Sequence, residues 1–183
     1  MRQIYETTLA THCAPVLLEK KPAALFAKPV WWDETRKGVP EIDDIKFLTL
    51  SRLGRNLLIF VYRHRLLAGS LGCGNVRAAL GGLGYPAPDD IEGCLSFLGG
   101  RFLRHTDFPH EVGFFLGYPF EDVMGFIADR GAHCKACGMW KVYSDVERAR
   151  ELFDEYEKCK LTLLDHIRKG GTILGGGLAL IAC

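Results

Sequence analysis

Cys13 and His110 are the two residues whose types best suit nucleophilic chemistry. Pro15 predicts that a helix begins near it, which places Cys13 at or beside the N-cap, where unpaired N–H groups and the helix dipole stabilise a thiolate. His110 enters a predicted strand later in the chain, and papain-like enzymes use the same order. An imidazolium near Cys13 would stabilise the thiolate and shuttle its proton. The alternative is a buried structural cysteine and a histidine that caps a strand.

A second group of potential ligands is the run His133-Cys134-Lys135-Ala136-Cys137. Two thiols separated by two residues, with a histidine before them, could supply three soft ligands to zinc or iron. His12 and Cys13 complete the set if the fold brings them near. Because the chain has no second closely spaced cysteine pair, the alternative is a glycine-bounded loop with incidental cysteines. A dithiol redox site is disfavoured, since these thiols precede a predicted strand and do not open a helix.

Lys141 and Tyr143 form the third candidate site. Alternation along a strand puts both side chains on one face, where they could bind an anionic group. The alternative is an edge strand that uses lysine to block unwanted pairing. The glycine-rich stretches match no phosphate-binding loop pattern, so the sequence gives no support for a nucleotide site.

Hydrophobic patterning predicts an α/β protein that forms a single domain over residues 1–183, with a small mixed sheet of about four strands and four or five flanking helices. We expect strands at 56–63, 111–117 and 139–143. A fourth segment, 23–28, suits either a strand or a helix. The unit from Phe108 to Asp145 has the order strand, helix, strand, and a right-handed crossover would make its strands parallel.

Helices are predicted at 64–80, 89–104, 119–131 and 144–169, the first of them broken by its glycines. Ser144 and Glu147 have the spacing of a capping box for the last helix. Residues 29–44 read as an irregular loop. The apolar tail 171–183 is predicted to dock against the domain or against a second copy, because its leucines would otherwise be exposed to water.

Composition limits the possible partners. Of 183 residues, 48% are hydrophobic and 25% are charged, which is ordinary for a globular protein. Lys plus Arg number 23 against 22 for Asp plus Glu, so the net charge of +1 attracts neither nucleic acid nor a membrane surface. No apolar segment of signal-peptide length opens the chain, and the seven cysteines are dispersed, so we expect reduced thiols and a cytoplasmic location. The remaining cysteines are expected to act as small hydrophobes; they are Cys73, Cys94, Cys159 and Cys183.

Three segments carry a family resemblance: THCAPVLLEKKPAALF, HEVGFFLGYPFEDVMGFI and CGMWKVYSDVERARELFDEYEKC. They are similar to those of short bacterial proteins, chiefly from anaerobes, that are known only as a domain of unknown function. The resemblance covers most of the chain and implies no activity. The Gly-rich run around 69–84 and the tail after Gly170 depart from the family pattern.

Three functional hypotheses follow from these residues. The first is a thiol-dependent enzyme that acts on a small molecule or peptide by acyl or sulfur transfer, with Cys13 as the nucleophile and His110 as its proton partner. The second is a non-enzymatic protein that holds a metal or a redox cofactor through the His and Cys clusters. The third is a structural interaction module, which forms a homo-oligomer if the tail docks on a second copy.

Overall fold

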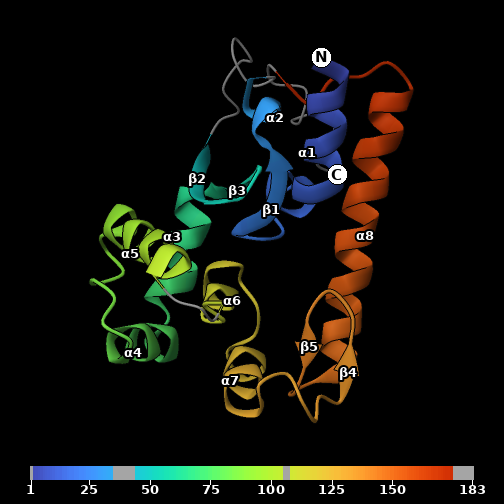
Figure 1. Ribbon diagram of the computed structural model, residues 1–183. Helices are drawn as coiled ribbons and strands as arrows, with labels where there is room; N and C mark the ends of the chain where they lie inside the picture. Colours follow the sequence, from blue (N-terminus) through green and yellow to red (C-terminus); the bar gives the residue numbers. More distant parts are fainter. Residues whose placement is uncertain (1, 35–43, 105–107, 175–183) are drawn as a thin grey trace. The chain divides into compact units, whose positions relative to one another are not determined.

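The computed structural model describes residues 2–34, 44–104 and 108–174. The chain forms two compact units: the first contains the segments up to His64 and from Tyr156 onward, and the second runs from Arg65 to Glu155. The predicted α/β class is confirmed, since the described residues form eight helices, a three-stranded sheet and a two-stranded sheet (Figure 1). All strand pairs among these residues are antiparallel, so the expected mixed sheet and parallel crossover are wrong.

The first unit is built on a sheet of strand order β1-β3-β2, with β1 at Ala23–Pro29, β2 at Ile45–Leu53 and β3 at Asn56–Arg63. The strands at 23–28 and 56–63 were expected, whereas β2 was not. A hairpin joins β2 to β3, and Gly54 begins its turn with a φ of 61°, a conformation that glycine adopts without strain.

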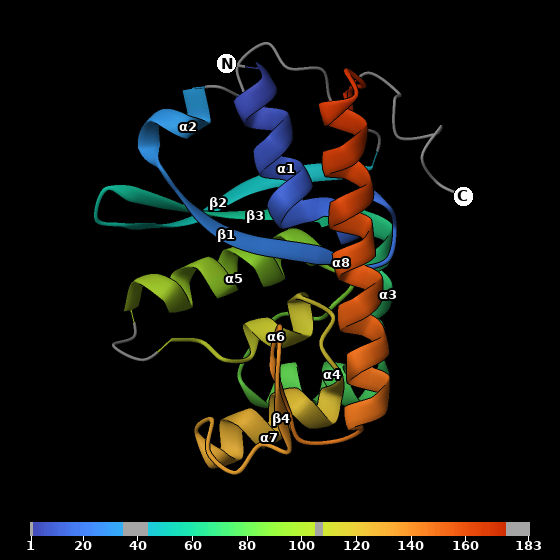
Figure 2. The ribbon, with the colours of Figure 1, turned by 90° about the vertical axis from the view of Figure 1, so that its right-hand side faces the viewer.

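Helices α1 (Arg2–Leu17) and the C-terminal part of α8 (Val146–Arg168) run side by side on one face of this sheet (Figures 1 and 2). Residues of β3 at alternate positions, Ile59 and Val61, enter the shared apolar core. The predicted irregular loop at 29–44 is partly wrong, because Val30–Glu34 form helix α2. Trp32 of α2 is buried and stacks on Tyr5, with ring centroids 5.3 Å apart; residues 35–43 lie outside the described part.

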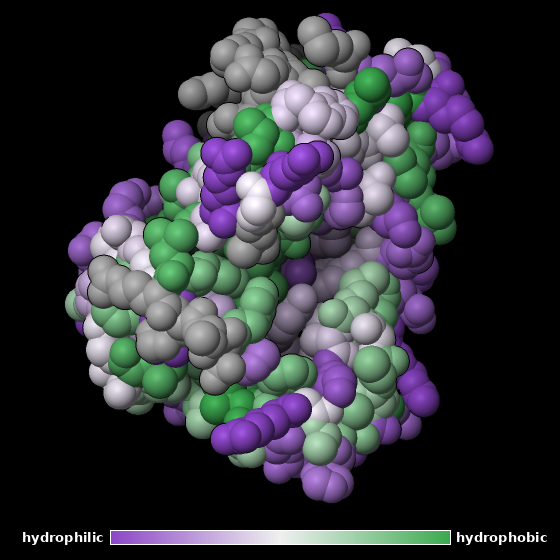
Figure 3. Space-filling model, viewed as in Figure 1, coloured by the Kyte–Doolittle hydropathy of each residue, from purple (hydrophilic) through white to green (hydrophobic). Residues whose placement is uncertain are grey.

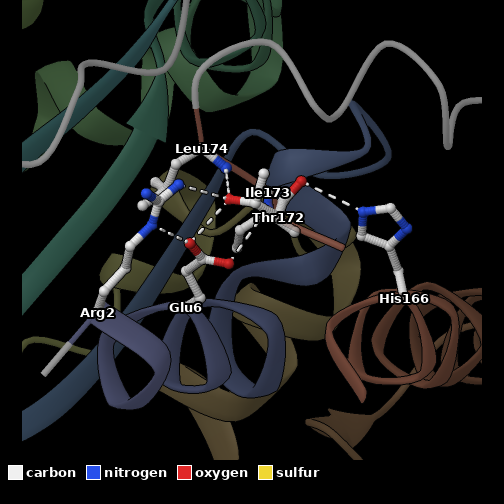
Figure 4. Close-up of polar contacts among 6 residues, drawn as sticks. All are labelled: Arg2, Glu6, His166, Thr172, Ile173 and Leu174. Carbon is white, nitrogen blue, oxygen red and sulfur yellow. Dashed lines mark hydrogen bonds and ion pairs between the residues drawn. The ribbon is translucent and has the colours of Figure 1, made fainter. Parts of the chain in front are cut away.

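A polar cluster joins the start of α1 to the segment that follows α8 (Figure 4). The buried Glu6 carboxylate accepts hydrogen bonds from Arg2 Nε at 2.9 Å and Thr172 Oγ1 at 2.8 Å. His166 Nε2 lies 3.2 Å from the Thr172 carbonyl oxygen. Leu174 is buried in the core, which confirms tail docking for that residue; the tail's other leucines lie outside the described residues.

The second unit is mainly helical and carries one short hairpin. Its elements are α3 (His64–Gly72), α4 (Gly74–Gly82), α5 (Ile91–Arg104), α6 (Val112–Phe115), α7 (Phe120–Asp129), β4 (Ala136–Cys137) and β5 (Lys141–Val142). The broken helix predicted at 64–80 is confirmed, with its break at Cys73, and so are the helices near 89–104 and 119–131. No helix among the described residues is long and apolar enough to cross a membrane.

The strand predicted at 111–117 is wrong, because Val112–Phe115 form the short helix α6. All four of its residues are buried, and Phe114 stacks on Phe120 with centroids 5.6 Å apart. A short apolar run that is buried on every side has the same sequence pattern whether it forms a helix or a strand. Gly113 allows close packing here, since a Cβ at that position would lie 2.7 Å from Val123.

The strand predicted at 139–143 is reduced to Lys141–Val142, which pairs with β4 and not with the 112–116 segment. The following helix, α8, begins at Val146, as the sequence predicts to within two residues. Its expected capping box is wrong: Asp145 accepts the Arg148 N–H at 2.9 Å, while the Ser144 hydroxyl donates to Asp122. Asp145 therefore caps α8.

Candidate functional site

Cys13 lies inside α1, four residues before the helix ends, and not at a helix start. The helix begins at Arg2 and includes Pro15 in its last turn. Cys13 is fully buried, and burial raises the pKa of its thiol, which the nearby Lys21 opposes only in part. The nearest end of the helix is the one whose dipole disfavours a thiolate. Cys13 therefore has neither of the two features expected to stabilise its thiolate at a helix start, the unpaired N–H groups and the positive end of the helix dipole.

The C-terminal end of α1 is closed by an arginine from the sheet. Arg63 of β3 donates from Nε to the Val16 carbonyl oxygen and from Nη2 to that of Leu17, each at 2.8 Å. A buried cation at this position satisfies helix carbonyls and complements the negative end of the dipole. Cys13 thus lies in a packed, capped helix end.

His110, the expected partner of Cys13, belongs to the second unit and precedes α6, so the strand expected around it is wrong. Its ring lies 4.6 Å from that of Phe126 and 5.7 Å from that of Phe108. Cys13 belongs to the first unit.

His12 also belongs to the first unit. Its ring stacks on Phe26 with centroids 4.9 Å apart and an interplanar angle of 11°. Burial, followed by the charges of Lys28 and Lys160, lowers the pKa of His12 and favours its neutral ring. Cys134 lies in the second unit, so the proposed metal set His12, Cys13, His133, Cys134 and Cys137 is divided between the units.

The two closely spaced thiols lie in the β4–β5 hairpin and just before it. Cys134 precedes the hairpin and is half-buried, whereas Cys137 in β4 is exposed, and both are free. The Lys135 N–H donates to the Val142 carbonyl oxygen at 2.8 Å, and the Gly138 N–H donates to that of Trp140 at 3.0 Å. These bonds fix the backbone directly after each of the two cysteines.

Lys141 and Tyr143 brace the turn that leads into this hairpin. The Lys141 ammonium donates to the Gly131 carbonyl oxygen, and the Tyr143 hydroxyl donates to that of Ala132 at 2.8 Å. Burial, then the neighbouring Cys134 and Asp129, raise the pKa of Tyr143. The two residues were candidates for binding an anionic ligand, with an edge strand as the alternative; in the structure their polar ends donate to backbone carbonyls.

Asp122 of α7 fixes the far end of the hairpin, a role that the sequence did not reveal. Its Oδ1 accepts hydrogen bonds from the Tyr143 N–H, the Ser144 N–H and the Ser144 hydroxyl, each at 2.8 Å. Its Oδ2 accepts one from Trp140 Nε1 at 2.7 Å. Burial acts to raise the pKa of this carboxyl, but the four hydrogen bonds outweigh burial and hold the pKa below its ordinary value.

Cys134 and Cys137 are the closely spaced potential metal ligands at the hairpin. Among the described residues, no three His, Cys, Asp or Glu side chains gather as a metal would require. The exposed His133 ring is 3.8 Å from the Asp129 carboxylate. The hairpin alone offers two thiols, which is half of a tetrahedral thiolate set.

The other cysteines follow the sequence expectation in part. Cys94 and Cys159 are buried, as expected of small hydrophobes, whereas Cys73 is exposed at the break between α3 and α4. Cys183 lies outside the described residues. Cys73 therefore provides an exposed thiol remote in sequence from the hairpin pair.

The fold and site define a small α/β protein with a thiol-bearing hairpin. The chain belongs to the family described as Protein of unknown function (DUF3793), whose model matches residues 9–174. This confirms the resemblance to a domain of unknown function. The comparisons with curated proteins and with solved structures found no match.

Proposed function

We propose that this protein is a non-enzymatic binding protein that holds a thiophilic metal ion, zinc or iron, through Cys134 and Cys137. The observation that supports this is the pair of free thiols, two residues apart, beside a hairpin held by Asp122, Lys141 and Tyr143. Zinc binds thiolates in structural sites, commonly with two to four residues between paired cysteines. A prearranged backbone lowers the entropic cost of gathering these ligands.

A thiol-dependent enzyme is the second candidate, with Cys13 and His110 as its working pair. Acyl or sulfur transfer to a small molecule or peptide requires an accessible thiolate. The complete burial of Cys13 and the raised pKa of its thiol weigh against that role. Metal binding at the hairpin needs neither a depressed Cys13 pKa nor a catalytic histidine.

The proposal includes a cytoplasmic location. Free thiols at Cys134 and Cys137 persist in a reducing compartment, where closely spaced cysteine pairs serve metal binding or catalysis more often than disulfide formation. Thiolate ligands must lose their protons on binding, so metal affinity should rise with pH.

Cobalt binding tests the proposal. Protein purified under reducing conditions and freed of metal should develop a thiolate-to-cobalt charge-transfer band on addition of Co²⁺, and zinc should displace the cobalt. Cys134→Ser and Cys137→Ser should each abolish the band, whereas Cys73→Ser, which removes another exposed thiol, should leave it unchanged. Binding that survives both hairpin substitutions, or a parent protein that takes up no metal, would refute the assignment.

A further inference from the structure

His12 lies where helix α1 of the first unit meets strand β1. Its ring stacks on the ring of Phe26 with an interplanar angle of 11°. Phe26 pairs with Ile59 of β3, and both belong to the core on the face of the sheet that carries α1 and α8. Because an aromatic ring covers one face of the imidazole, the plane of the His12 ring is held in place.

Lys28 brings a positive charge to the same face of the sheet. It lies two residues after Phe26 on one strand, so the two side chains point the same way. Its cross-strand partner is Leu57, which packs against the core under the helices. Lys28 is half-buried and forms no ion pair within the part of the chain that the structure describes.

Lys160 of α8 brings a second positive charge. It is half-buried and lies one helical turn before Leu163, a fully buried core residue. Its ammonium pairs with the partly exposed Glu157 carboxylate at 2.9 Å. The charges of Lys28 and Lys160 both act on His12, so residues of three elements gather there. Two ammonium groups and one carboxylate leave a net charge of +1 while His12 is neutral and +2 when its ring is protonated.

The groups in this cluster define what it can bind. An ammonium group donates hydrogen bonds and accepts none, and an imidazole N–H adds a further donor. A ligand must therefore be anionic and must carry several acceptors. A phosphate group offers three strong acceptor oxygens and a charge of about −1.5 to −2 at pH 7, which matches the charge of the cluster.

We propose that His12, Lys28 and Lys160 form an anion-binding site in the first unit, and that its ligand is a doubly charged oxyanion group, phosphate or sulfate. The site is separate from the thiols Cys134 and Cys137, and nothing in it depends on a metal. A free phosphate ion and a phosphate ester of a small molecule present the same oxygens, so the experiment compares the two.

Isothermal titration calorimetry of the full chain with sodium phosphate, at pH 7 and constant ionic strength, tests the site. We expect saturable binding of one phosphate per chain. Lys28→Gln and Lys160→Gln should each weaken binding about tenfold or more, because each removes a charge-assisted donor. Both a tighter affinity for glycerol 3-phosphate, which assigns an ester, and an equal affinity, which assigns the free ion, support the site.

Lys158→Gln is the matched control. Lys158 is exposed and lies two residues before Lys160, which places it on the opposite side of α8. Hydrophilic residues follow α8 along much of its length, on the right of the view in Figure 3. Removing one lysine from that outward surface should leave phosphate binding unchanged.

The titration of His12, followed by NMR of its ring, gives a second readout on the unaltered protein. Sulfate stays doubly charged over the range in which histidine titrates, about pH 5 to 8, so any pH dependence of its binding comes from the protein. Bound sulfate should raise the pKa of His12, because a nearby anion favours the imidazolium. Sulfate should therefore bind more tightly as the pH falls through that pKa.

Three results would overturn the proposal. The first is a parent protein that binds neither phosphate nor sulfate saturably. The second is an equal loss of affinity for Lys158→Gln and Lys160→Gln, which would indicate diffuse attraction to surface charge. The third is a His12 pKa that sulfate leaves unchanged.

Discussion

Replacing Asp122 by Asn tests whether this carboxylate fixes the hairpin. The amide oxygen can take the place of Oδ1 and keep the bonds from the Tyr143 N–H and from the Ser144 N–H and hydroxyl. The amide NH₂ then takes the place of Oδ2 and faces the indole N–H of Trp140, which is buried. Two donors therefore oppose each other where the parent protein has a short hydrogen bond.

The expected cost follows from that lost bond. A hydrogen bond to a charged group contributes about 1.5–3 kcal/mol, and a buried donor without a partner costs about 1–3 kcal/mol. We expect Asp122→Asn to lower the free energy of unfolding by about 2–3 kcal/mol, and Asp122→Ala, which removes all four bonds, by about 3–5 kcal/mol. In a Trp140→Phe background no indole N–H remains, so Asp122→Asn should cost less than about 1 kcal/mol there.

The assay is a double-mutant cycle in which urea unfolding at pH 7 is monitored by circular dichroism. The four proteins are the parent, Asp122→Asn, Trp140→Phe and the double variant, with Asp154→Asn on the exposed side of α8 as the matched control. The control should change the unfolding free energy by no more than about 0.5 kcal/mol. Equal costs of Asp122→Asn in the two backgrounds would refute the assigned bond to Trp140.

The same pair of proteins gives a pH test. The folded-state pKa of Asp122 is lowered, so its stabilising contribution is present above the ordinary carboxyl pKa of about 4 and is lost as pH falls through the depressed folded value. The stability gap between the parent and Asp122→Asn should therefore narrow below about pH 4. A gap of the same size at pH 7 and pH 3 contradicts this.

Three further predictions concern other parts of the chain. Glu6→Ala should lower the free energy of unfolding by about 2–3 kcal/mol, because it strands buried donors of the 172–173 segment. Cys13 should resist alkylation in the folded protein at pH 8 while Cys73 is labelled, as read by mass spectrometry, because burial both shields Cys13 and raises the pKa of its thiol. Gly138→Ala should cost about 1–3 kcal/mol in urea unfolding, because the new Cβ would lie 2.2 Å from the Phe153 ring.

Each of these three predictions has a control residue elsewhere in the chain. Glu157→Ala removes a partly exposed ion pair with Lys160 and should cost no more than about 1 kcal/mol; an equal loss for Glu6→Ala would contradict a buried role. Labelling of Cys13 as fast as Cys73 would restore the enzyme hypothesis. A Cβ at Gly81 in α4 meets open space, so Gly81→Ala should not destabilise; a similar result for Gly138→Ala would count against close packing there.

The sequence correctly predicted those helices and strands whose residue pattern fits only one kind of secondary structure. The run at 56–63, rich in β-branched and aromatic residues, became β3, and the glycines of 64–80 marked the break between α3 and α4. The run at 112–116 has two explanations, because it is buried on every side as a helix or as a strand. Its surroundings, Phe120 and Val123 among them, decide the outcome and are not visible in the run itself.

The site was harder to predict than the fold. Proline is common in the first turn of a helix, so Pro15 suggested a helix start. In the structure α1 extends back to Arg2, and Pro15 lies in its last turn. Cys13 therefore lies near a buried helix end and not at the expected N-cap. Asp122 lies in the first turn of α7, where any carboxylate suits the helix dipole. Its hydrogen-bond partners Trp140 and Tyr143 follow about twenty residues later, and no local pattern announces bonds formed by tertiary packing.

The order of segments along the chain has a consequence for biosynthesis. The second unit is one continuous stretch, Arg65–Glu155, and all of it is synthesised before the last segment of the first unit's core. The first unit closes only when Leu163 and Leu174 reach α1 and its strands. Until then the apolar faces of α1 and β1 that these residues cover stay exposed to water. The first segment to be synthesised is therefore among the last to be fully buried. This stage of synthesis exposes a sheet to aggregation, and the Glu6–Thr172 bond forms when it ends.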